Sequence, residues 1–80
     1  MGEEMNGRRR IRLREALAML NSVIIIVDDV CNGEQDAADN YPENLQNTEK
    51  FEAMESAVES LNEAVEKIDE AKEHIEDAIK

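Results

Sequence analysis

The second half of the chain places apolar residues at alternating steps of three and four. This seam consists of Phe51, Met54, Val58, Leu61, Val65, Ile68, Ile75 and Ile79. Lys72 takes the one remaining seam position, and alanine recurs every seven residues beside the seam, at Ala57, Ala64, Ala71 and Ala78. Small residues there let a neighbouring helix approach closely. Because most other positions are polar, the pattern predicts an amphipathic coiled-coil helix over residues 48–79.

The first half repeats this scheme less cleanly. Its seam consists of Leu13, Leu17, Leu20, Ile24, Val27 and Cys31. Met19, Ile25 and Ile26 add apolar side chains off the seam, so that the run 23–27 is apolar on all sides. Five β-branched residues in a row also fit a strand, but the flanks keep the helical period and no second strand is available for pairing. We therefore predict a helix over residues 8–38, after a disordered segment of residues 1–7.

The link between the two helices contains the only proline of the chain, Pro42. Proline disfavours the α conformation at the preceding Tyr41 and suits the start of a new helical turn. Asn47 or Thr48 is then expected to cap the second helix. Two helices of about 30 residues, each about 45 Å long, joined by a connection over residues 39–47, predict an all-α fold. Its architecture is an antiparallel two-helix coiled-coil hairpin.

Charge is distributed unevenly along a chain whose net charge is −11. The start of the first helix carries a basic cluster of Arg8, Arg9, Arg10, Arg12 and Arg14. The end of the second helix carries the acids Glu70, Glu73, Glu76 and Asp77. Each cluster opposes the dipole of its own helix, and an antiparallel hairpin sets the two side by side. The arginines are expected either to be neutralised there or to bind phosphate groups of an anionic ligand, in a site between subunits if several clusters converge.

The size of the chain indicates self-association. A domain of 80 residues with one cysteine and one histidine has no internal disulfide or structural zinc site to stabilise it, and such small scaffolds usually gain stability from oligomerisation instead. A helix that is apolar on all sides is buried on more than one side, whereas a hairpin partner covers only one. We therefore predict a multi-helix bundle oligomer whose interface contains Met19, Ile25 and Ile26.

Catalysis, metals and cofactors find little support in the sequence. His74 lies at an outward position, and Glu70 precedes it by four residues instead of the three typical of carboxylate-bridged metal bundles. Aromatic residues make up 2% of the chain, too few to line a deep pocket. General acid/base chemistry requires two carboxyls held in a cleft. We therefore predict a protein that is not an enzyme and binds no metal or cofactor.

The basic cluster followed by apolar residues resembles a signal peptide. However, the apolar stretch from Ala16 to Val27 is interrupted by Asn21 and Ser22 and lacks a small-residue cleavage site. Its twelve residues are fewer than the roughly 20 needed to span a bilayer. We therefore predict a cytoplasmic protein without a membrane partner, with Cys31 a reduced and packed thiol. The acidic surface disfavours nucleic acid as a partner, although the acids of the second helix resemble the phosphates of DNA toward a basic enzyme.

The connection contains more polar groups than a chain reversal requires. They are Asp39, Asn40, Glu43, Asn44 and Gln46, around Tyr41. They are expected to cap the two helix ends or to form a recognition tip. The segment Asp39–Gln46, followed by Thr48–Glu55 and heptad repeats, resembles small helical proteins of bacteriophages and prophages, in which an apolar helix leads into a D-N-x-P-E-N-L-Q turn and a Glu-rich helix. The resemblance covers roughly residues 34–79.

This resemblance implies a phage accessory protein in the cytoplasm of an infected or lysogenic bacterial host. Small acidic phage proteins of this build counter host defences by inhibiting a host protein or by sequestering a nucleotide signal. A purely structural module that assembles with itself is the alternative consistent with the same residues.

Overall fold

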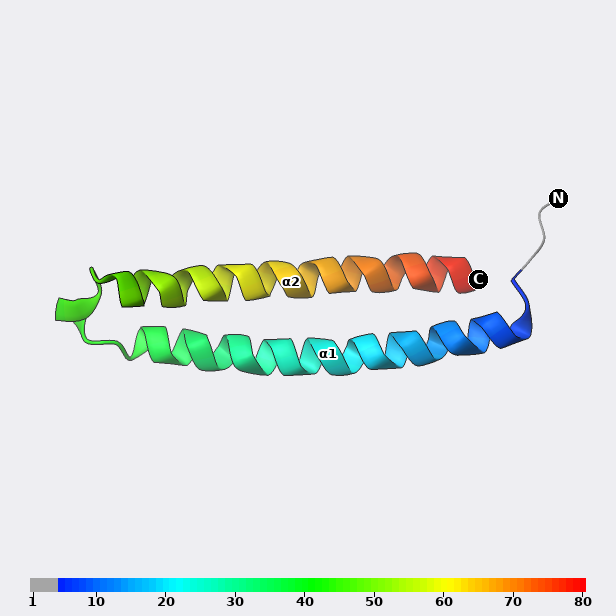
Figure 1. The fold of residues 1–80 in the computed structure, drawn as a ribbon, viewed down its shortest axis with the longest axis horizontal. Helices are drawn as coiled ribbons and strands as arrows, with labels where there is room; N and C mark the ends of the chain where they lie inside the picture. The colour runs from blue at the N-terminus through cyan, green and yellow to red at the C-terminus, as the bar shows by residue number, and fades with distance from the viewer. Residues whose placement is uncertain (1–4) are drawn as a thin grey trace.

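The computed structural model describes residues 5–80 as two long helices joined by a short turn (Figure 1). Helix α1 spans Gly7–Asp39, the 3₁₀ turn η1 spans Glu43–Leu45 and helix α2 spans Glu49–Ile79. The two helices run side by side in opposite directions, so the start of α1 lies beside the end of α2. No strand occurs among the described residues. The predicted all-α hairpin is thus confirmed.

Each helix begins at a side chain that caps its exposed backbone N–H groups. Asn6 Oδ1 accepts a hydrogen bond from the backbone N–H of Arg9 at 2.9 Å, and Thr48 Oγ1 accepts one from Phe51 at 3.4 Å. Thr48 was one of the two caps expected from the sequence. Helix α1 begins at Gly7 after this cap, one residue before the predicted start at residue 8. Residues 1–4 of the segment predicted to be disordered lie outside the described residues.

The helices pack along the two predicted seams. Cys31, Ala38 and Val58 are buried, and the remaining seam residues of both helices are half-buried. Cys31 Sγ lies 3.7 Å from the carbonyl oxygen of Val58 and 3.5 Å from Asn62 Oδ1, which confirms the packed thiol. Lys72 is half-buried on the seam, and its Nζ reaches Asp69 at 3.9 Å. Its aliphatic stem therefore covers the seam while its charge stays in contact with water.

The turn closes the hairpin with an aromatic pair and a set of local hydrogen bonds. The rings of Tyr41 and Phe51 pack with centroids 5.6 Å apart. Gln46 Nε2 donates to the carbonyl of Tyr41, and Thr48 Oγ1 donates to that of Leu45. The two hydrogen bonds hold the connection itself, and the ring pair joins a residue shortly after α1 to the first turns of α2.

The hairpin is a single layer of helices. Its principal extents are 64, 21 and 13 Å, whereas stable domains usually consist of at least two packed layers. The chain exposes 6240 Å², while a compact monomer of 9.1 kDa exposes about 4,900 Å². One layer therefore leaves much of each helix in contact with solvent.

Candidate functional site

The apolar residues of α1 that lie off its seam form a second stripe along the helix. Its members follow one another at steps of three and four: Ala16, Met19, Val23, Ile26, Val30, Gly33 and Ala37. With 3.6 residues per turn, the centre of this second stripe lies about 110° around the helix from the centre of the seam. Met19 is 68% exposed, Ile26 63% and Val30 51%. The second stripe therefore has the period of a packing surface but is covered by no part of the described chain.

The second stripe extends onto one broad side of the hairpin. Cys31 lies opposite Val58, and Arg10 opposite Ile79, so residues at the same level along the hairpin have numbers that sum to about 89. In an antiparallel pair of this register, Val23 and Val30 lie on the same side of the seam as Ala64 and Ala57. We call this side, with the second stripe and the alanines of α2, the apolar face.

The opposite broad side of the hairpin is polar. Cys31 meets the amide oxygen of Asn62 there, and a shallow surface depression is lined by Gln35, Glu55 and Glu59 together with the edges of the seam. The two sides differ because each helix carries small or apolar residues on one flank of its seam and polar residues on the other. One face of the hairpin is therefore suited to packing and the other to water.

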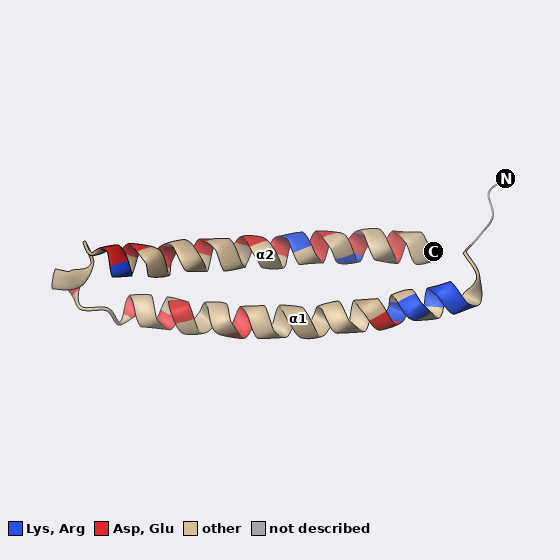
Figure 2. Cartoon of the chain, viewed as in Figure 1, with Lys and Arg blue, Asp and Glu red and all other residues tan. Residues whose placement is uncertain are grey.

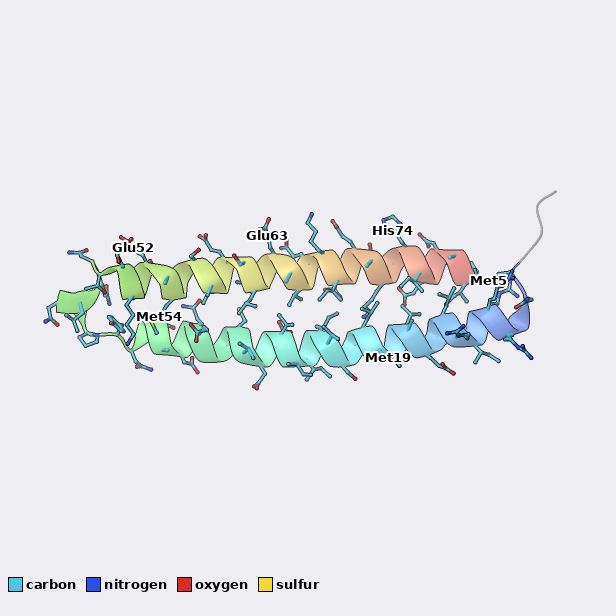
Figure 3. All side chains as sticks on the ribbon, in the orientation of Figure 1. Met5, Met19, Glu52, Met54, Glu63 and His74 are labelled. Atoms are coloured by element: carbon cyan, nitrogen blue, oxygen red, sulfur yellow. The ribbon has the colours of Figure 1, made fainter. Side chains whose placement is uncertain are left out.

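The three predicted interface residues do not lie together. Met19 and Ile26 belong to the second stripe, and Figure 3 shows Met19 on the side of α1 that faces away from α2. Ile25 is equally exposed, at 69%, but it lies about 100° around the helix from Ile26. It forms part of a shallow depression with Asp28, Asp29 and Asn32. Ile25 therefore lies outside the second stripe, whereas Met19 and Ile26 belong to it.

The five arginines lie in the first turns of α1 (Figure 2). At about 100° per residue, they point to several sides of the helix instead of gathering on one. Arg10 points to α2, where its Nε donates to the carbonyl oxygen of Ile79 at 3.0 Å. Such a contact satisfies a terminal carbonyl and favours the negative end of the helix dipole. The side chains of Arg8, Arg9, Arg12 and Arg14 are exposed. The cluster therefore does not form a single anion site within one chain.

Arg9 and Arg12 are the two arginines that share a groove. The groove is shallow, and its other walls are Met5, Leu13 and Ala16. Since Ala16 begins the second stripe, the groove is the basic continuation of the apolar face. A cationic rim on an apolar floor is suited to an anion that also carries an apolar part.

The expected neutralisation of the arginines by the acids of α2 does not involve ion pairs. Within residues 5–80, the ion pairs join neighbouring turns of α2: Lys67–Glu70 at 3.6 Å, Lys72–Asp69 at 3.9 Å and Lys80–Asp77 at 3.3 Å. The basic start of α1 does lie beside the acidic end of α2 (Figure 2). The two clusters are therefore close enough to attract each other, and the one direct contact described there is the hydrogen bond from Arg10 to the carbonyl of Ile79.

The polar turn is largely engaged in its own structure. Asp39 accepts a hydrogen bond from Gln35, and Asn40 donates to the carbonyl of Asp36, both at 2.9 Å. Gln46 and Tyr41 hold the turn as described above. Glu43 and Asn44 are exposed. Of the two roles expected for the turn residues, capping and closure therefore accounts for Asp39, Asn40, Tyr41 and Gln46.

The acidic side chains of α2 point outward. Figure 3 shows Glu52, Glu63 and His74 on the side of α2 that faces away from α1, and all three are exposed. In the described part of the chain, no three side chains of the types that ligate metals come together. The outer side of α2 is a solvated acidic surface with one histidine.

Helix α1 has the length and composition of a membrane-spanning helix. An 18-residue window within it has a mean hydropathy of 1.5 with at most two charged residues, and 6% of that window is buried in the chain. The window is longer than the twelve apolar residues counted from the sequence, and α1 continues without a break through Asp28 and Asp29. The core helix of a soluble protein and a signal sequence near the N-terminus have the same length and composition, so this similarity is weak support for a membrane.

A comparison of the chain with family models, with curated proteins and with solved structures finds no match. The fold and the site therefore define the class: an all-α helical hairpin with one apolar face, an open end where a basic and an acidic cluster lie side by side, and an acidic turn end.

Proposed function

We propose that this chain is a non-enzymatic oligomeric binding protein whose first partner is another copy of itself. The observation that carries the proposal is the second stripe, where Met19, Ile26 and Val30 stand more than half exposed in a heptad pattern. Contiguous exposed apolar surfaces on soluble proteins mark interaction sites. A helix bundle formed by several hairpins would cover the stripe and supply the second layer.

The composition of the second stripe favours a helix over lipid as its partner. Its residues follow one another at steps of three and four, the spacing with which helices interlock, and its small residues Ala16, Gly33 and Ala37 lie at its two ends. A lipid surface requires apolar area but no such periodicity. Asp28 and Asp29 interrupt the apolar stretch of α1 and are exposed, and such charges are costly in hydrocarbon. We accordingly propose a cytoplasmic location.

Light scattering on the wild type and on the double variant Met19→Glu/Ile26→Glu tests this function. We expect the wild type to scatter as a multiple of 9.1 kDa and the variant as a single chain. Flotation of the wild type with anionic liposomes is the companion measurement. An equal mass for both proteins, or flotation of the wild type, would contradict the proposal.

Capture of a small anionic, nucleotide-like ligand is the second candidate function. The groove between Arg9 and Arg12, with its apolar floor of Met5, Leu13 and Ala16, favours it. A thermal shift with ATP should then disappear in Arg9→Ala/Arg12→Ala. The matched control Arg14→Ala/Lys80→Ala removes the same charge from exposed positions on the polar side of the hairpin and should keep the shift. Absence of any shift in the wild type would remove this candidate.

Inhibition of a host protein is the further variant of a binding role, and the exposed acids along the outer side of α2 favour a basic target. The turn over residues 39–46 and its resemblance to phage and prophage proteins support a phage accessory role in countering host defence. Salt-sensitive binding to a basic nuclease, lost when Glu52 and Glu63 become Gln, is the result this variant requires. A purely structural assembly would bind neither ATP nor the nuclease.

A further inference from the structure

The two ends of the hairpin differ strongly in charge. The half that contains the start of α1 and the end of α2, residues 5–23 and 66–80, has eight basic and seven acidic residues and a net charge of +1. The half that contains the turn, residues 24–65, has eleven acidic residues and Lys50, for a net charge of −10. Figure 2 shows this polarity along the length of α1. This difference in charge therefore favours one relative orientation of two copies in an assembly over the other.

Two hairpins can cover each other's apolar faces in two symmetric ways. In the first, equal ends lie together, so that two halves of charge −10 repel each other. In the second, the ends are opposed, and each −10 half lies against a +1 half. Like charges across an interface disfavour an arrangement, and complementary ones select it. We propose that two copies form an antiparallel four-helix bundle with opposed ends, in which α1 packs on α1 of the second copy. This inference rests on the proposed self-association.

The second stripe has the same order of side-chain sizes in both directions. A two-fold axis between Ile24 and Ile25 brings Val23 level with Ile26 of the second copy, Met19 level with Val30, and the small Ala16 level with the small Gly33. Large side chains thus meet in the middle, and small ones meet towards both ends. An antiparallel pair of α1 helices in this register is therefore self-complementary in size.

The alanines of α2 fit the same two-fold axis. The level of Ile24 and Ile25 corresponds to Ala64 and Val65 on α2, because opposed residues sum to about 89. Ala57 and Ala71 lie symmetrically about Ala64. Small residues at this spacing allow two helices to approach closely. The same two-fold axis therefore fits both the second stripe of α1 and the alanines of α2, although these two patterns are independent features of the sequence.

The same register gives the basic groove of Arg9 and Arg12 a partner. The two arginines come level with Asn40 and Ala37 of the second copy, and Arg12 comes within one helical turn of Glu34. Glu34 lies about 50° around α1 from the centre of the second stripe, and Arg12 lies in the continuation of that stripe. Each end of the dimer would contain one such pair of opposite charges. The pairing assigns Arg12 and Glu34 to dimer orientation.

A charge-exchange experiment tests this pairing. We expect Arg12→Glu and Glu34→Arg each to weaken self-association by about tenfold or more, because each homodimer then opposes like charges at both ends. An equimolar mixture should recover wild-type affinity as a heterodimer. The control mixture combines Glu34→Arg with Arg14→Glu, which lies on the opposite side of α1 from Arg12, has the same net charge and should not recover it. A mixture of the first two variants that fails to associate would overturn the orientation.

A distance measurement gives a second, independent test. A single spin label at Asn44→Cys, in a Cys31→Ala chain, should lie more than about 40 Å from the label of the second copy, given 1.5 Å per residue of helix. A distance under about 25 Å indicates equal ends together and overturns the orientation while leaving the proposed function intact. A folded single chain without dipolar coupling overturns both. A mass above two chains overturns the four-helix bundle alone.

Discussion

Helices α1 and α2 have similar lengths, 33 and 31 residues, and share one seam, but they differ in what lies outside it. The remaining sides of α2 carry alanines, serines and exposed charged residues, which water solvates. Those of α1 carry Met19, Ile26 and Val30 in a second heptad pattern. The number of stripes of large apolar residues on a helix therefore indicates how many of its sides must be covered. Helix α2 carries one such stripe beside its row of alanines, whereas α1 carries two.

The largest effect is expected at Ile26, where a charge would break the second stripe. Ile26→Glu should weaken self-association by about two orders of magnitude or more, because it removes a buried side chain and buries a charge in both copies. Ile25→Glu is the matched control, since its neighbouring side chain is equally exposed but lies off the stripe. Sedimentation velocity measures both. Equal dissociation of the two variants would show that the stripe does not define the interface.

A substitution at Ile24 tests the seam of the hairpin. Ile24→Ala should reduce the free energy of unfolding by about 2 kcal/mol, because Ile24 packs against α2 and its truncation leaves a cavity. Ile25→Ala, at an exposed position, should change it by less than about 0.5 kcal/mol. Urea unfolding followed by circular dichroism gives both values. Similar losses at the two positions would contradict the assignment of the seam.

The cap of α2 contributes less than the seam. Thr48→Ala should lower stability by about 1 kcal/mol, because the N–H of Phe51 loses its side-chain acceptor. Thr48→Ser keeps the hydroxyl and should retain most of that stability. The same urea titration measures both variants. A loss as large for Ser as for Ala would assign the effect to the methyl group of Thr48 instead of the cap.

Gly33 gives the smallest expected effect and sharpens the contrast between the two stripes. A Cβ added at Gly33 meets nothing within 4 Å in the chain, and Ala is the better helix former, so Gly33→Ala should stabilise by about 0.5 kcal/mol. Thermal unfolding at a fixed protein concentration gives the value. A clear loss of stability would indicate that a partner packs against Gly33 too closely to leave room for an added methyl group.

Periodicity alone predicted most of the fold. The three-and-four spacing identified both helices, and the place of Lys72 on the seam followed from it, because apolar burial is the main force that orients a helix. Thr48 was predictable since a capping side chain has a short reach and a preferred residue type. Asn6 was missed because no apolar period precedes α1 to mark its start, although an Asn–Gly pair ahead of a helix is a recognisable signal.

The candidate site was predicted less completely. The off-seam residues of α1 were recognised as interface candidates, but Ile25 and Ile26 were grouped by adjacency, although neighbours on a helix point about 100° apart. The arginines were treated as one cluster for the same reason. Their partners were not predictable, because a long, exposed side chain contacts whatever lies within its reach and shows no period. The register of α1 against α2 determines where the two-fold axis lies. It was not predictable from the sequence, because it depends on tertiary contacts such as that of Cys31 with Val58.

The central claim is that the second stripe of α1 is covered by another copy of the chain. Sedimentation equilibrium of the wild type at micromolar concentration tests it most directly. We expect a mass of twice 9.1 kDa with full helicity. A fully helical, cooperatively unfolding protein that sediments as one chain would contradict it.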